Sequence, residues 1–185
     1  MKLFRAAVAA GSLVIVTAAL TGLTSAAAYA APSAQDTLFF QQAHQANLAE
    51  IAAGNLAIQK GASQQVRDLG ARFVTDHTNL DQGLQQAAAT LGVALPTTPN
   101  AQQQDVQAQL QNASGAAFDS LFISTQITGH MQVMQLGETE LADGTDPTAK
   151  QVVATAAPVV AAHLELLHAA ATALGVPVPA EVQQR

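Results

Sequence analysis

The sequence predicts an all-α protein in which four long helices form a bundle. Alanine, glutamine and leucine dominate the chain, and aromatic residues make up only 4% of it, a composition that favours helices over a sheet. Apolar residues recur at intervals of three and four over long stretches, whereas alternating β-branched patterns are rare. Glycine, proline and capping residues separate the periodic stretches, so the helices are expected to be distinct and joined by turns.

Residues 1–30 are expected to be a secretory signal peptide. They begin with the basic residues Lys2 and Arg5, continue with an apolar run, and end with the small-residue pattern Ala28-x-Ala30. The run is rich in alanine and has no charged stop, which favours a cleaved signal over a membrane anchor. We therefore expect residues 31–185 to form a single domain outside the cytoplasm, either in the periplasm or in the medium. No second segment is expected to span a bilayer.

The predicted mature domain is acidic and contains no cysteine. Without Lys2 and Arg5, the basic residues fall from 7 to 5 against 13 acidic ones, which gives a net charge of −8 with neutral histidines. This charge argues against nucleic acid and anionic lipid as partners. The absence of cysteine excludes a disulfide framework and a lipid-anchored lipoprotein.

Capping residues mark the helix boundaries. The expected helices cover residues 37–60, 64–91, 115–142 and 147–174. Residues that suit an N-cap precede them, namely Asp36, Ser63, Ser114 and Asp146. Glycine follows three of the helices, at Gly61, Gly92 and Gly175.

The connections have unequal lengths. Residues 92–114 separate the second and third long helices, and within them residues 100–111 can form a short amphipathic helix around Val106 and Leu110. The other two connections are short, so they should join antiparallel hairpins. The long link reaches roughly 55 Å against about 40 Å for one helix. It is long enough to cross the bundle, as the connection in ferritin-like bundles does.

Three core stripes each carry a histidine where an apolar residue is expected. His77 lies between Phe73 and Leu80, His130 between Ile127 and Met134, and His163 between Val160 and Leu167. All three histidines lie within about one turn of the middle of their helices, so antiparallel packing should bring them to one level.

The first helix offers a carboxylate at the same level. Glu50 is the one acidic residue in the interior of that helix, and small neighbours such as Gly54 leave it room to point inward. Imidazole and carboxylate suit zinc, iron, manganese or copper. We therefore hypothesise that Glu50, His77, His130 and His163 bind one divalent metal ion. The alternative is that each histidine is a hydrogen-bonded core residue or is half exposed.

Other polar residues rank below these four. Asp76 is either an acceptor behind a metal ligand or a solvated acid. His44 lies about two turns from the middle of its helix and is read as a histidine at the edge of the core. Asp119 lies near a helix start, where its charge favours the helix dipole. Glu165 and His168 are expected to be solvated.

A family resemblance covers nearly all of the predicted mature chain. The matching residues are, in order, Phe39, Phe40, Glu50, Gly54, Asp76, His77, Phe118, Asp119, His130, Pro158 and His163. In this pattern the chain resembles the exported bacterial family named domain of unknown function 4142. The resemblance implies a ferritin-like four-helix bundle and an extracytoplasmic location, and it implies no established activity.

The pattern differs from that of ferritin-like enzymes with two metal ions, which carry a glutamate three residues before the ligand histidine. Here Val74 and Val160 stand three residues before His77 and His163, so a single histidine-rich site fits better than a bridged pair. The leading function is therefore an exported metal-binding bundle for sequestration, delivery or stress protection.

Two other classes of function remain open. A metal-dependent oxidoreductase acting on reactive oxygen species ranks lower, because the single tyrosine, Tyr29, lies in the predicted signal peptide and leaves no phenol as a proton donor. The remaining class is a structural or partner-binding bundle without metal. In that class, the apolar faces of residues 37–60 and 115–142 would continue into a homodimer interface.

Overall fold

The computed structural model describes residues 31–178, and the predicted signal peptide lies outside this range. Within it, the all-α prediction is confirmed, since the chain forms five helices and no strand. The helices are α1 (Ala34–Lys60), α2 (Gln64–Leu91), α3 (Ala101–Asn112), α4 (Gly115–Asp143) and α5 (Pro147–Leu174).

The start of α1 differs from the prediction. Ser33, and not Asp36, is the N-cap: its hydroxyl accepts from the Asp36 backbone N–H, while the Asp36 carboxylate accepts from the Ser33 backbone N–H. This reciprocal capping box satisfies two amide groups at once, which explains why the helix begins three residues earlier than expected.

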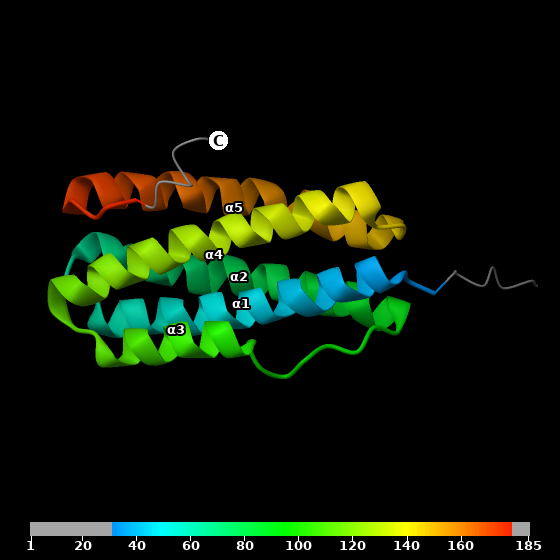
Figure 1. Ribbon diagram of the computed structural model, residues 1–185, viewed down its shortest axis with the longest axis horizontal. Coiled ribbons are helices and arrows are strands. Elements are labelled where there is room, and N and C mark those ends of the chain that lie inside the picture. The colour runs from blue at the N-terminus through cyan, green and yellow to red at the C-terminus, as the bar shows by residue number, and fades with distance from the viewer. Residues whose placement is uncertain (1–30, 179–185) are drawn as a thin grey trace, which may run out of the picture. The chain divides into compact units, whose positions relative to one another are not determined.

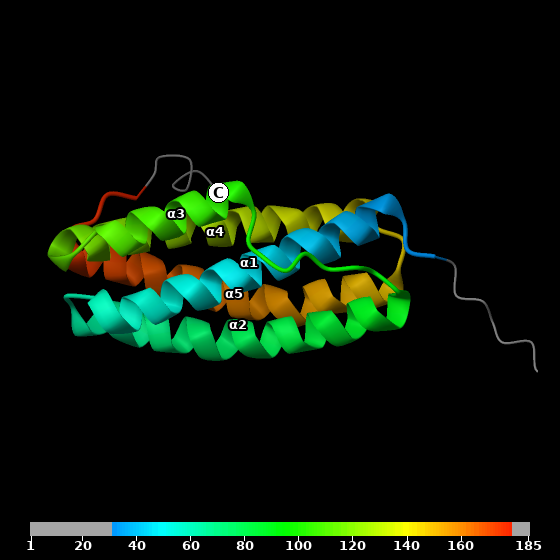
Figure 2. The same ribbon diagram turned by 90° about the horizontal axis from the view of Figure 1, so that it is seen from below.

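The four long helices form two hairpins that pack against each other (Figure 1). α1 packs against α2 and α4, and α5 packs against α2 and α4, so α1 and α5 lie on one diagonal of the bundle. An isolated bridge pairs Gly61 with Gly115, which places the start of α4 beside the turn between α1 and α2. The long link therefore crosses the bundle, and α2 and α4 run in the same direction. α3 lies on the outside against α1 and α4 (Figure 2).

Carboxylates fix the two ends of the bundle. Asp119 of α4 accepts hydrogen bonds from the backbone N–H groups of Ala62 and Ser63, each at 2.8 Å, and so holds the turn between α1 and α2. The interpretation of Asp119 as a helix-dipole residue alone missed this contact. At the other end, Asp36 accepts from the backbone N–H groups of Thr145 and Asp146, which immediately precede α5.

The core is divided into two apolar clusters with a polar layer between them. One cluster lies toward the turn between α1 and α2 and includes Phe73, Phe118, Phe122, Ile127 and Leu167. The other lies toward the turn between α4 and α5 and includes Phe39, Phe40, Leu84, Ala149 and Val153. The buried polar layer consists of His44, Asn47, Glu50, His77, Asp81, Gln126, His130 and His163. The candidate site thus lies in the middle of the core.

Helix α5 is long and apolar enough to cross a membrane by length and composition. The expectation that no segment after the signal peptide could do so was therefore wrong on these two criteria. In the structure, α5 supplies Val153, His163 and Leu167 to the interior of the bundle. Its apolar character is thus used, in part, for packing against the other helices.

α1 and α2 approach each other closely at two glycines. A Cβ atom at Gly70 would lie 2.6 Å from the carbonyl oxygen of Gly54 and 2.7 Å from the Cβ atom of Ala57. The first of these atoms belongs to backbone, which cannot rotate away as a flexible side chain can. Any larger residue at Gly70 must therefore push the two helices apart.

We expect Gly70→Ala to lower the free energy of unfolding by about 1–3 kcal/mol, because overpacking displaces backbone. Gly83→Ala, on the same helix, is the matched control, since a Cβ atom there meets no atom of the described part of the chain within 4 Å. That change should raise the free energy of unfolding by about 0.5–1 kcal/mol through helix propensity alone. Urea unfolding followed by circular dichroism measures both, and effects of the same sign would contradict the close approach.

Candidate metal centre

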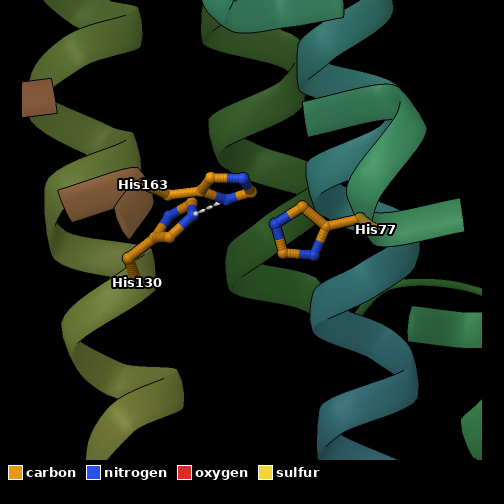
Figure 3. A group of neighbouring side chains, drawn as sticks. All are labelled: His77, His130 and His163. Atoms are coloured by element: carbon orange, nitrogen blue, oxygen red, sulfur yellow. Dashed lines mark hydrogen bonds between the residues drawn. The ribbon is translucent and has the colours of Figure 1, made fainter. Parts of the chain in front are cut away.

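Three histidines from three helices meet in the polar layer. His77 of α2, His130 of α4 and His163 of α5 each offer one ring nitrogen, and these three atoms lie within 4.8 Å of one another (Figure 3). The side chains are buried, with exposed fractions of 3%, 1% and 0%. They meet at one level because each lies near the middle of its helix and the three helices have nearly equal lengths.

The other ring nitrogen of each histidine is held by an oxygen acceptor. His163 Nε2 donates to Asp76 Oδ2, His130 Nδ1 to the backbone carbonyl of Gln126, and His77 Nδ1 to Asn47 Oδ1, all at 2.9 Å. The three acceptors are a carboxylate, a backbone carbonyl and a side-chain amide oxygen. Hydrogen bonds of this kind fix the tautomer and orientation of metal-binding histidines.

These outer hydrogen bonds determine the protonation state of the inner nitrogens. A neutral imidazole carries one N–H, and here that proton lies on the outer nitrogen, so each inner nitrogen presents a lone pair. His130 Nε2 and His163 Nδ1 are only 3.1 Å apart (dashed line in Figure 3). His77 Nε2 is buried and has no hydrogen-bond partner among the residues that the structure describes. The centre therefore gathers three lone pairs and lacks a positive charge between them.

A proton is poorly suited to supply that charge. Burial lowers the pKa of His77 and of His130, with the neighbouring histidines adding to the effect, and the pKa of His130 falls to about 3. Burial also lowers the pKa of His163, although the hydrogen bond and charge of Asp76 oppose this. Neutral imidazoles are the form that binds metal ions. The arrangement therefore favours a metal ion over an additional proton.

Glu50 lies behind His130, away from the inner nitrogens. Its Oε1 is 3.6 Å from His130 Nδ1, the outer nitrogen, and it is not among the ligand atoms that come together. With its amide nitrogen turned toward Glu50, the Gln126 side chain donates to both carboxyl oxygens. Burial raises the pKa of Glu50 to about 8, so the group is mainly uncharged at neutral pH. The structure thus separates Glu50 from the three histidines with which the sequence grouped it.

A second buried network adjoins the histidines. Asp81 Oδ1 accepts from His44 Nδ1 at 2.7 Å and from the Asn47 amide at 3.4 Å, which leaves Asn47 Oδ1 turned toward His77. His44 is therefore a buried partner of Asp81, and it is linked to the candidate ligand His77 through Asp81 and Asn47. The sequence reading overlooked Asp81, although it lies four residues after His77 and so on the same face of α2.

Two of the acceptors, Asp76 and Gln126, lie on helices that also carry a candidate ligand. The prediction that Asp76 accepts a hydrogen bond behind a ligand is matched by its contact with His163 of α5. Asp76 also pairs with Arg72 of its own helix, α2. Gln126 lies four residues before His130, so its carbonyl faces that ring by helix geometry, and this regular spacing could have identified it.

Phe73 covers the histidines from the side of the first apolar cluster. Its ring centroid lies 4.5 Å from that of His163 and 5.0 Å from that of His130, and its side chain is fully buried. The aromatic ring therefore limits the rotation of two histidines and excludes water from that side.

The family model described as Domain of unknown function (DUF4142) matches residues 21–183, so the chain belongs to this family. No curated protein and no solved structure matches the chain. The family description supplies no activity, and the relation to ferritin-like bundles stays a prediction.

Proposed function

We propose that this DUF4142 protein binds one divalent metal ion through His77, His130 and His163. One observation supports this most strongly: three buried imidazoles each offer a ring nitrogen, and these nitrogens lie within 4.8 Å of one another, while the outer nitrogens are held by acceptors. Three neutral imidazoles suit zinc, copper, iron or nickel among divalent ions. The backbone carbonyl of Gln126 would hold the orientation of His130, and Glu50 would lie behind the same ring nitrogen.

The proposed role is sequestration, delivery or protection against metal stress outside the cytoplasm. The predicted signal peptide supports export, and a metal site buried in a preformed bundle suits retention of an ion. Metal would supply Lewis acidity if a coordination position stayed open, but storage and delivery require no such step.

The experiment uses untagged protein from the extracytoplasmic fraction of its native host. Intact mass should place the N-terminus at Ala31, and elemental analysis should find about one equivalent of a first-row metal per chain, as one three-histidine site requires. Metal-free protein titrated with Co²⁺ should develop visible absorption bands of low-coordinate cobalt.

The combined variant His77→Ala, His130→Ala and His163→Ala should lose both the metal and the cobalt bands. His168→Ala is the control, because that imidazole lies on α5 outside the group of three. Far-ultraviolet circular dichroism verifies that the helices persist. Unchanged metal content in the triple variant would show that the metal binds elsewhere and would refute the three-histidine site. No metal in the wild-type protein would leave a bundle without a metal function.

A further inference from the structure

A cavity of about 710 Å³ lies among the four long helices, on the side of the histidines away from Phe73. Its lining is mainly apolar and includes Ala43, Leu84, Ala87, Val133, Val153 and Val160. His77 and Asp76 form part of the same lining, so the cavity extends to the histidine centre. Its volume falls within the roughly 300–1,000 Å³ that is usual for small-molecule sites.

Small residues, among them Ala43, Ala87 and Ala156, line part of the cavity. Gly83, on the exposed side of this lining, leaves room for a side chain, since an added Cβ atom would meet no atom of residues 31–178 within 4 Å. Two large apolar side chains of the lining, Met134 and Leu141, remain 39% and 49% exposed. An apolar surface that is both recessed and wet is costly, and an apolar occupant would remove it from water.

The charges of the lining restrict the occupant. Asp76 and Glu138 contribute carboxyl groups, whereas no lysine or arginine is among the described residues that line the cavity. An anionic ligand would meet like charges and no buried cation, and its desolvation would be uncompensated. Thr148, Gln151 and Thr155 offer neutral hydrogen-bonding groups along α5. A hydroxyl group fits these partners without carrying charge into the cavity.

We propose that this cavity binds a neutral, hydrocarbon-rich molecule with a single hydroxyl group, of the class of long-chain alcohols. Apolar lining provides the affinity, and the polar groups of α5 orient the hydroxyl end. The inference does not depend on metal binding, because the apolar part of the lining lies outside the three histidines.

The first test is a fluorescence titration of the purified protein with N-phenyl-1-naphthylamine, an uncharged apolar probe. Binding should be saturable, and 1-dodecanol should displace the probe. Dodecanoate, with the same chain and a negative charge, should displace it about tenfold less well, because a charge must be desolvated. The absence of saturable binding, or equal displacement by the alcohol and the acid, would overturn the proposal.

The second test compares two leucine substitutions on α2. Gly83→Leu places a side chain in the cavity and should weaken probe binding about tenfold or more through steric exclusion. Gln82→Leu adds the same side chain at the preceding exposed position, outside the lining, and should leave probe affinity unchanged. Thermal unfolding verifies that both variants are folded. Equal affinities in the two variants would place the probe elsewhere and contradict the assignment.

Metal content separates this proposal from the proposed function. Gly83→Leu should retain the metal of the wild-type protein, and chelator-treated protein should retain probe affinity. A protein that binds the probe but no metal would sustain the cavity and refute the metal site. A protein that binds metal but no probe would refute the cavity proposal and sustain the metal site.

Discussion

Saturating divalent metal is expected to raise the free energy of unfolding by about 4 kcal/mol when free metal is roughly 1,000 times its dissociation constant. The gain arises because the folded state holds three inner nitrogens within 4.8 Å of one another, whereas the unfolded chain does not hold them together. Urea unfolding of chelator-treated and zinc-loaded protein, followed by circular dichroism, measures this difference.

The variant with His77, His130 and His163 replaced by alanine is the control for that measurement. Zinc should not stabilise it, because the ligands are gone, while His168→Ala should be stabilised as much as the wild-type protein. Stabilisation of the triple variant by zinc would show that the ion acts elsewhere. No stabilisation of the wild-type protein would count against any binding specific to the folded state.

Phe73→Ala is expected to lower the free energy of unfolding by about 3–5 kcal/mol, the usual cost of deleting a buried aromatic side chain. Phe73 is fully buried, and its ring lies 6.0 Å from that of Phe122 and against His130 and His163. The cavity left behind would also free two imidazoles to rotate. We therefore expect metal affinity to fall about tenfold, within the range seen when the support of metal ligands is removed.

Leu110→Ala separates the packing effect from the effect on metal. Leu110 is a fully buried member of the same apolar cluster, but it lies on α3, outside the four-helix interior. Its removal should cost about 2–5 kcal/mol and leave metal affinity unchanged. Urea unfolding and competitive metal titration give the two quantities. If both variants changed metal affinity equally, the contribution of Phe73 would be general stability alone.

The helix boundaries could be predicted because they depend on local chemistry. α2 and α5 end at Leu91 and Leu174, as expected, since Gly92 and Gly175 take left-handed conformations with φ of 69° and 65°. The start of α1 was predicted too late because Ser33 and Asp36 both suit a cap. Which of the two is the N-cap depends on the capping box that they form together.

For the candidate site, the sequence predicted which helix face carries each histidine and not which atoms come together. Periodicity placed His77, His130 and His163 on core stripes at similar heights, and the structure brings their nitrogens together. Periodicity does not specify side-chain rotamers, so it could not reveal which nitrogen of each ring faces inward. For the same reason it grouped Glu50 with the histidines, whereas the carboxyl group lies at the outer nitrogen of His130.

The amino-acid sequence by itself determined where the helices lie and, for α2 and α5, which face is buried, because caps and apolar periodicity act over a few residues. On α4, Met134 was placed on the buried stripe but is 39% exposed. Tertiary structure decided the partners of the buried polar groups. Asp76 reaches a histidine on α5, Asn47 of α1 reaches one on α2, and a cavity remains open beside Gly83. These features depend on how the helices are rotated and spaced against each other, and no local pattern encodes that geometry directly.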